Sequence, residues 1–285
     1  MLTLDEIKEL EMGLVRSLQG GRIDYYNTTT LMWNSYIHGT VGIYNGSMWV
    51  PVTPPSQVNF VNNSYDINGS SLVAGKNYDV FARYQNEQTF SLALAPWTSN
   101  TSRVSELSRF EGVLVYNTTT SGKQMRYLGT IRTDSSINFV DSATQRFVVN
   151  WDNCIMKCVN TYNSSYTDWT WSSTTWQEFR AGSSQVKGEF LLTRSGSSFM
   201  SVAQAYISAD SSQVWLATAL NSTTAYSGKD IFDYVYGNSR HTIICHTYIS
   251  PVLGYNYITM LAKNSSSSSL YGGQDHTRGI AFIYT

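Results

Sequence analysis

The residues of this sequence that are best suited to act as nucleophiles or metal ligands are three cysteines and four histidines. Cys154 and Cys158 are four positions apart, and Cys245 stands next to His246. A structural zinc site needs two tightly spaced ligand pairs, which this pattern does not supply. The histidines also lie in no nucleophile or metalloprotease motif. We therefore expect reduced or buried thiols that behave as small hydrophobic residues, with no metal and no cofactor.

Paired carboxylates would be the groups needed to cleave a polysaccharide. The candidates for such a pair are Glu106, Glu111, Asp134 and Asp141. Proximity in the sequence does not set the separation that such a pair needs, and the long repeated strands of a polysaccharide-cleaving β-helix are missing. An ion pair with Arg146, or a turn cap, explains Asp141 more simply. We expect no catalytic residue and no enzymatic activity.

Aromatic side chains offer a second kind of chemistry, since flat rings with polar edges bind both saccharides and proteins. Trp169 and Trp171 are two positions apart, so they share one face of a strand, and such a face is normally core. We favour core packing for them and for Trp176 over a sugar-stacking platform. Tyrosines near turns suit a surface better, because their hydroxyl groups tolerate water.

Two C-terminal loops, 221–228 and 263–274, combine Ser, Thr, Tyr and Gly, a mixture that makes adaptable contacts. A rigid β framework presents such loops for recognition. We therefore place the binding surface in this part of the chain. The candidate binding residues are Tyr226, Tyr255, Ser267 and Tyr271.

Helical periodicity is clear only at the start of the chain. Between residues 2 and 18, apolar residues fall at three- and four-residue steps, and charged residues occupy the other side. Gly20 and Gly21 end the pattern. A helix this short needs a partner, which is its own domain, the same helix in symmetry-related copies, or a groove on a larger assembly. We expect residues 1–20 to form an amphipathic anchoring helix, with a docking side that includes Leu4, Ile7, Leu14 and Leu18.

Strands and turns follow the helix. Alternating β-branched and aromatic residues are bounded by Gly, Asn and Ser, and Asn45-Gly46 predicts a hairpin turn between strands at 40–44 and 48–52. The segment 138–161 fits either a helix face or a strand that leads into a bend, and we favour the strand. Further strands are expected at 31–36, 57–61, 77–84, 89–95, 112–116, 126–132, 188–193, 200–208, 213–219, 241–249, 255–262 and 279–284.

The predicted fold class is mainly β: a short N-terminal helix, then two antiparallel β-sandwich or jelly-roll-like domains at 21–180 and 181–285. Only 14% of the residues are charged and the net charge is −1, without a basic cluster, which argues against nucleic-acid binding. The first twenty residues carry charges where a signal peptide is apolar. No window reaches the ~18 apolar residues of a membrane span, so we expect no membrane insertion.

One stretch is informative through its residue order. Arg126–Thr130 (RYLGT) is followed by Asp141-Ser142, Arg146-Phe147-Val148 and Trp151, and this order resembles a segment of structural proteins of tailed bacteriophages. The resemblance extends upstream and downstream, through 42–50, 72–83 and 169–180. The final segment, 251–285, resembles the last two strands of the complement and tumour-necrosis-factor type of jelly roll.

These resemblances imply a virion structural protein of the tail-fibre, collar or head-spike kind, with a trimerising C-terminal module. Such a protein lies on the particle exterior, is made in the host cytoplasm without a signal peptide, and docks on other virion proteins through its N-terminal part. Its C-terminal sandwich would contact a host-surface glycan or protein, and the chain would form a homotrimer. The alternatives are a capsid decoration or cement protein and a carbohydrate-binding or polysaccharide-degrading protein.

Overall fold

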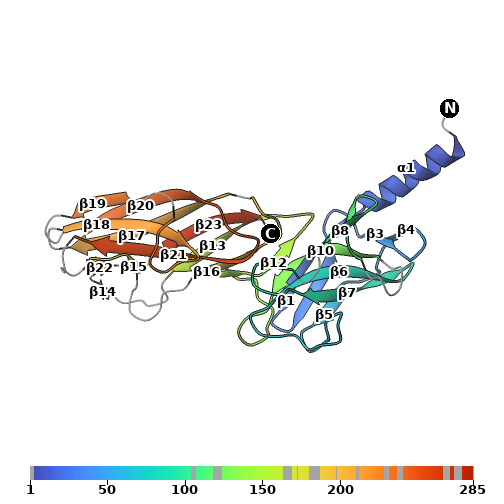
Figure 1. Ribbon diagram of the computed structural model, residues 1–285, viewed down its shortest axis with the longest axis horizontal. Coiled ribbons are helices and arrows are strands. Elements are labelled where there is room, and N and C mark those ends of the chain that lie inside the picture. The colour runs from blue at the N-terminus through green and yellow to red at the C-terminus, as the bar shows by residue number, and fades with distance from the viewer. Residues whose placement is uncertain are drawn as a thin grey trace. The chain divides into compact units, whose positions relative to one another are not determined.

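The computed structural model (Figure 1) divides into two compact units. The first contains Met1–Asp141, Phe147–Ile155 and Thr285, and the second contains Ser142–Arg146 and Met156–Tyr284. Strands dominate both units and one helix precedes them, which confirms the predicted fold class. The structure describes residues 3–103, 107–117, 124–162, 169–171, 173–179, 187–196, 198–209, 212–227, 231–235, 240–265, 270–272 and 278–284.

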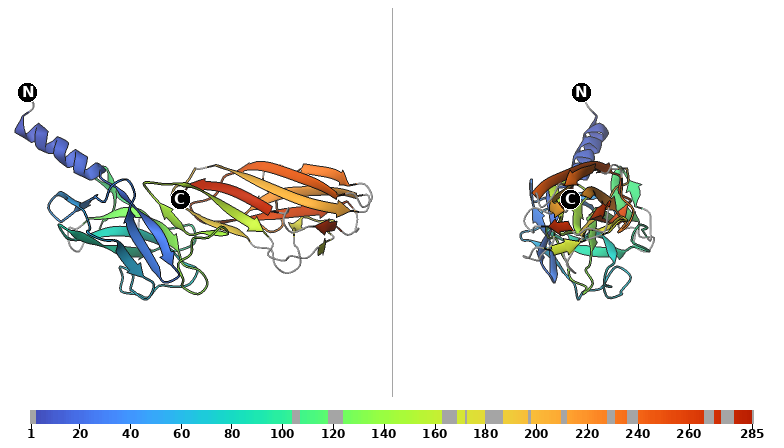
Figure 2. Two further views of the ribbon diagram at one scale, coloured as in Figure 1. Left: turned by 180° about the vertical axis from the view of Figure 1, so that it is seen from behind. Right: turned by 90° about the vertical axis from the view of Figure 1, so that its left-hand side faces the viewer.

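Helix α1 (Leu4–Ser17) forms where the apolar periodicity predicts it. Thr3 begins the helix with a capping box: its side chain accepts from the Glu6 N–H, and the Glu6 side chain accepts from the Thr3 N–H. Asp5 and Glu6 in the first turn and Arg16 in the last turn complement the helix dipole. Leu18 is the C-cap. Figures 1 and 2 show the N-terminal end of α1 pointing away from the strands of its own unit.

The first unit is built from short antiparallel sheets. One has the strand order β7-β6-β10-β9-β8, with β12 also paired to β10; the others are β1-β2-β5 and the hairpin β3-β4. The predicted Asn45-Gly46 turn connects β3 to β4. The strands are β1 (Gly21–Asn27), β2 (Thr30–Ser35), β3 (Val41–Tyr44), β4 (Trp49–Val52), β5 (Val58–Val61), β6 (Asn77–Asn86), β7 (Thr89–Pro96), β8 (Ser108–Phe110), β9 (Val113–Asn117), β10 (Gln124–Arg132) and β12 (Val148–Asn150).

A buried polar network accompanies the aromatic core of the first unit. Asp79 is 3% exposed, pairs with Arg103 at 2.8 Å, and accepts from the Thr130 hydroxyl at 2.7 Å. Arg103 also lies over the Trp97 ring at 4.6 Å. Burial raises the pKa of Asp79, although Arg103 and Thr130 act in the opposite direction. The network satisfies groups that would otherwise be costly to bury.

The second unit is a β-sandwich of two six-stranded sheets. One has the order β11-β16-β21-β18-β19, with β15 on β21; the other has the order β13-β23-β17-β22-β14, with β20 on β17. All pairs are antiparallel except β11 with β16. The strands are β11 (Gln145–Arg146), β13 (Met156–Tyr162), β14 (Trp169–Trp171), β15 (Gln177–Glu178), β16 (Gly188–Leu192), β17 (Phe199–Ala209), β18 (Ser212–Leu220), β19 (Ile231–Val235), β20 (Arg240–Ile249), β21 (Gly254–Asn264), β22 (Leu270–Gly272) and β23 (Arg278–Tyr284).

The boundary between the units differs from the expected one at residue 180. β13 pairs with β23 along its whole length, from Met156 opposite Tyr284 to Tyr162 opposite Arg278. This pairing brings β13, and with it β14 and β15, into the second unit. The ambiguous segment 138–161 contains β11, β12 and part of β13, so the strand prediction is confirmed there.

Aliphatic residues, several alanines and three phenylalanines fill the interior of the second unit among its described residues. Residues of the two sheets meet in two adjoining clusters, which include Phe179, Phe190 and Phe199. The buried alanines of this unit are Ala203, Ala205, Ala217, Ala219, Ala262 and Ala281.

In the part of the chain that the structure describes, no helix has the length and apolarity needed to cross a lipid bilayer.

Candidate functional site

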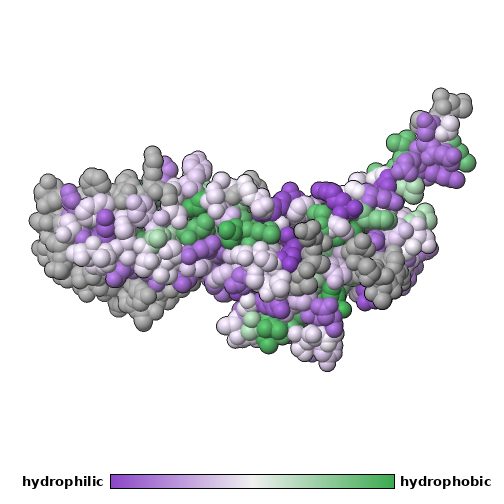
Figure 3. Space-filling model, viewed as in Figure 1, coloured by the Kyte–Doolittle hydropathy of each residue, from purple (hydrophilic) through white to green (hydrophobic). Residues whose placement is uncertain are grey.

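Helix α1 leaves its apolar side bare. The exposed fractions are 67% for Leu4, 41% for Ile7, 62% for Leu10 and 66% for Leu14, and no residue of the helix is buried. We call these four residues the docking stripe; Figure 3 shows hydrophobic surface along the helix. Leu18, expected on the same side, instead caps the helix and is partly buried. Within the described residues, the stripe therefore does not pack on its own domain.

The C-terminal end of α1 is held closely against β3. The Gly42 N–H donates to the Leu18 carbonyl at 2.9 Å, and a Cβ at Gly42 would lie 1.9 Å from the Val15 carbonyl oxygen. This approach requires glycine. Arg126 of β10 donates from Nη1 to the carbonyls of Arg16 at 2.8 Å and Gly42 at 3.1 Å. A cation at this position complements the negative end of the helix dipole.

Glu111 provides a second attachment for the helix. It lies with Gly112 in the turn between β8 and β9, and both residues have positive φ, 48° and 86°. This conformation is uncommon for a residue with a side chain. The Glu111 carboxylate accepts from Arg16 at 2.8 Å and from the Trp49 indole at 3.0 Å. Glu111, a candidate for polysaccharide cleavage in the sequence, thus joins the helix to its unit.

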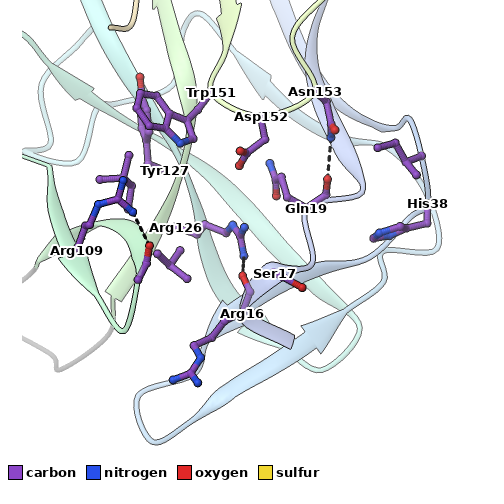
Figure 4. A pocket seen from close by; sticks show the side chains of 14 residues that line it. Arg16, Ser17, Gln19, His38, Arg109, Arg126, Tyr127, Trp151, Asp152 and Asn153 are labelled. Carbon is purple, nitrogen blue, oxygen red and sulfur yellow. Dashed lines mark hydrogen bonds between the residues drawn. The ribbon is translucent and has the colours of Figure 1, made fainter. Parts of the chain in front are cut away.

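A recess of about 520 Å³ lies beside this attachment (Figure 4). Burial lowers the pKa of Arg126 to about 10, and nearby Asp152 partly opposes that shift. Asn153 donates to the Gln19 carbonyl at 2.7 Å. The Arg126 Nε and the Gln19 Oε1 are buried without a hydrogen-bond partner among the described residues. Burying such groups costs free energy, which the attachment of the helix has to offset.

Sequence reasoning did not find Gly42 or Arg126 as attachment residues. A charged residue inside β10, a strand that is otherwise mostly apolar, was the available signal for Arg126, because buried charges need partners. Those partners are backbone carbonyls 84 and 110 positions away, and no local pattern identifies them. Gly42 resembles any strand glycine until the helix end is placed against it.

The other candidate carboxylates do not form a described pair. Asp134 accepts from the backbone N–H groups of Ser136 at 2.7 Å and Asn138 at 2.8 Å, so it closes a turn. Asp141 is partly buried, and Glu106 lies outside the described residues.

The cysteines lie in different surroundings. Cys154 is exposed in the first unit, whereas Cys158 is partly buried and Cys245 is buried in the second. Cys245 and His246 point to opposite sides of β20, because successive strand residues alternate. The described residues contain no group of three or more His, Cys, Asp or Glu that would hold a metal ion.

The four candidate binding residues differ in exposure, and the structure describes the side chains of only two of them. Tyr226 is 41% exposed. Tyr255 is partly buried, and its hydroxyl donates to the carboxylate of Glu189. Ser267 lies outside the described residues, and only the backbone of Tyr271, in β22, is described.

An aromatic cluster surrounds Tyr226. Its ring lies 4.9 Å from that of Trp176, and the Lys263 Nζ lies 5.1 Å from the Trp176 ring and 4.7 Å from the Trp215 ring. A lysine ammonium within about 5 Å of two indole rings is attracted to both by cation–π interactions. Trp176 therefore packs on surface residues, in contrast to the expected core position. The side chains of Trp169 and Trp171 lie outside the described residues.

No protein-family model matches this sequence, and no curated protein matches it. Among solved structures, the insecticidal delta-endotoxin Cry8Ea1 from Bacillus thuringiensis is similar over 98% of this chain and 55% of its own, at 8% identity and a TM-score of 0.28. BuGH86wt, in complex with neoagarooctaose, is similar over 94% and 34%, at 10% identity and a TM-score of 0.28. The infectious bursal disease virus Gt strain is similar over 94% and 73%, at 7% identity and a TM-score of 0.28. The chain thus spans about half the length of the delta-endotoxin and about a third of the length of BuGH86wt. Likeness at this level carries no information on function.

Proposed function

We propose that this chain is a non-enzymatic structural component of a bacteriophage virion, of the tail-fibre, collar or head-spike kind, which attaches to the particle through helix α1. The observation that carries the proposal is the docking stripe, an apolar helix side left bare while the end of the helix is fixed by Gly42, Arg126 and Glu111. A fixed end pre-organises the helix and lowers the entropy cost of docking. The phage-like order of residues from Arg126 to Trp151 supports the virion context.

The charge of the helix specifies the chemistry of the partner. Asp5, Glu6, Glu9 and Glu11 outnumber Lys8 and Arg16 on α1. The matching surface is an apolar groove with basic residues on its rim, on another virion protein, because helix-in-groove binding buries an apolar side between charged edges.

Non-enzymatic function is supported by the two candidate carboxylates whose contacts are described. Glu111 holds the helix, and Asp134 closes a turn. Contact with a host-surface glycan or protein belongs in this proposal to the second unit, where Tyr226 and Trp176 present stacked rings. Aromatic rings with polar edges bind both kinds of partner.

Incorporation into particles tests the proposal. Particles are assembled with the full chain, a chain lacking residues 1–20, and the variants Leu10→Glu and Leu14→Glu. All three changes should reduce incorporation at least about tenfold. The deletion removes the docking stripe, and each glutamate places a charge in the centre of an apolar contact, where side chains contribute most of the binding free energy. The matched control is Lys8→Glu, which adds negative charge on the polar side and should incorporate normally. Normal incorporation of Leu10→Glu and Leu14→Glu would contradict attachment through α1.

A further inference from the structure

The recess beside the C-terminal end of α1 contains a buried cation that lacks a counter-ion. Arg126 is only 5% exposed and, with a pKa of about 10, is still charged at neutral pH. Among the described residues it forms no ion pair, and Asp152 acts on it only at longer range. Burying an arginine without a paired anion is costly, and the negative end of a helix dipole offsets only part of that cost. A negatively charged ligand would supply the missing partner.

The guanidinium of Arg126 has donors that the attachment of the helix does not use. Nη1 donates to the carbonyls of Arg16 at 2.8 Å and Gly42 at 3.1 Å. Nε is buried without a partner, and Nη2 forms no hydrogen bond with any described residue. Because Nε is closed off from solvent, Nη2 is the nitrogen that a ligand in the recess can reach. A carboxylate there would accept a charge-assisted hydrogen bond, which is stronger than one between neutral groups.

The charges around the recess favour a ligand with a single negative charge. Its lining includes Arg16, Arg109 and Arg126, and one carboxylate, that of Asp152. Arg16 is already paired with two glutamates, at 2.9 and 2.8 Å. Arg109 is exposed, and its Nη1 donates to an uncharged acceptor, the Gly112 carbonyl, at 2.7 Å. Arg109 and Arg126 against Asp152 leave an excess of one positive charge, which complements a carboxylate better than a phosphate with nearly two negative charges.

The wall of the recess is held in place by its own contacts and is partly apolar. The ring of Trp151 lies 5.6 Å from that of Tyr127, and Asn153 donates to the Gln19 carbonyl at 2.7 Å. The His38 ring is held by a backbone N–H that donates to its Nδ1 at 3.2 Å. Figure 4 shows these side chains around the recess. A preformed wall lowers the entropy cost of binding, and about 520 Å³ is a volume typical of small-ligand sites.

We propose that this recess binds a ligand that carries a carboxylate, which accepts from Arg126 and is attracted by Arg109, while its apolar part contacts Trp151. The unused donor of a buried cation, open to a preformed recess with excess positive charge, carries the proposal. Two sources supply this chemistry: an acidic side chain of a partner polypeptide and a free small carboxylate. The inference goes beyond the proposed function and does not depend on docking through the apolar stripe of α1.

An NMR titration of the isotope-labelled full chain tests the proposal, with glutamate and glutamine blocked at both backbone ends, and propionate, as probes. Blocked glutamate should shift the side-chain N–H signals of Arg126 and Trp151 with a Kd on the order of 1 mM, as expected of so small a ligand. Blocked glutamine has the same shape without the charge and should not bind. Tighter binding of blocked glutamate than of propionate assigns the site to a polypeptide residue, and equal Kd values assign it to a free carboxylate. No shift with either carboxylate, or equal shifts with blocked glutamine, would overturn the proposal.

Two substitutions with opposite expected effects locate the carboxylate without disturbing Arg126. Asp152→Asn keeps the shape of the side chain and removes the competing charge, so the Kd of blocked glutamate should fall about threefold, and Arg109→Gln should raise it about threefold. The control Arg83→Gln makes the same charge change as Arg109→Gln at an exposed position of β6 and should leave the Kd unchanged. Equal Kd values for all four chains, or a higher Kd for Asp152→Asn, would place binding elsewhere and overturn the proposal. Particle incorporation is not the readout, so the role of α1 keeps its own test.

Discussion

The two units fill their interiors with different side chains, although both are made of antiparallel strands. The first buries many large rings, and Trp97 and Tyr127 lie beside the charged pair of Asp79 and Arg103. The second, in its described residues, buries mainly Val, Leu, Ile and Ala side chains, with three phenylalanine rings. The fully or nearly fully buried rings of the first unit include Trp49, Trp97, Tyr78, Tyr127, Phe81, Phe139 and Phe147.

This difference has a consequence for the surfaces. Large rings bury much apolar area within a unit, so the first unit has a core that supports a projecting helix. The aliphatic side chains of the second unit each bury less area than a large ring, and this unit exposes Met200, Ile244 and Tyr248. Under the proposed function, the first unit holds the attachment element, and its core of large rings supports that element.

The largest expected effect is on the charged pair of the first unit. Asp79→Ala leaves the Arg103 guanidinium buried without its carboxylate, which should cost about 3–5 kcal/mol of unfolding free energy. Hydrogen exchange measured by mass spectrometry should show faster exchange in β6, β7 and β10, with the second unit unaffected. Glu9→Ala removes the exposed Glu9–Arg16 pair and serves as the control, at about 1 kcal/mol or less. Loss of protection in both units would contradict their independence.

Overpacking should affect the second unit next most strongly. Ala203→Leu inserts a larger side chain where the two sheets meet, and should destabilise that unit by about 1–3 kcal/mol. Thermal unfolding followed by calorimetry should show one transition shifted and the other retained. If the unit tolerates leucine without a shift, its interior is looser than the alanine packing indicates.

A smaller change in unfolding free energy is expected from a substitution at Gly42, where the C-terminal end of α1 meets β3. Gly42→Ala places a Cβ 1.9 Å from the Val15 carbonyl oxygen, so the helix end must move away from β3. Because the helix itself buries no residue, unfolding free energy should fall by about 1 kcal/mol or less. Limited proteolysis should nevertheless cleave faster between Ser17 and Gly21. Unchanged cleavage would show that the attachment does not depend on this approach.

Glu111→Gln should have the smallest effect. It keeps the shape of the side chain but removes the ion pair with Arg16, an exposed contact expected to contribute about 0–1 kcal/mol. Amide exchange in the last turn of α1 should rise slightly, while β8 and β9 remain protected. A large loss of stability would mean that the positive-φ turn at Glu111 depends on the carboxylate.

Local sequence patterns predicted much of the fold. The steps of three and four residues identified α1, and the alternation around Thr89–Pro96 and Gly254–Asn264 identified β7 and β21, because each signal lies within one element. Strand partners lie far apart in the chain, so the pairing of β13 with β23, and therefore the unit boundary, could not be predicted. β1 was also missed, although it begins at Gly21, the second of the two glycines that end the helical pattern.

For the candidate site, the sequence predicted only the apolar side of the helix, and neither its exposure nor its attachment to the first unit. Leu4, Ile7 and Leu14 were named from periodicity, but exposure is a property of the folded chain. The attachment by Arg126 and Glu111 joins residues about a hundred positions from the helix.

Accessibility of the docking stripe, compared between free protein and assembled particle, tests the central claim most directly. Leu14→Cys places a thiol in the stripe and Lys8→Cys places one on the polar side, each in a chain with Cys154 and Cys158 replaced by serine. We predict that both thiols react with a maleimide in the free protein, and that assembly protects only the thiol at position 14. Equal reactivity of that thiol in free protein and particle would contradict attachment through helix α1.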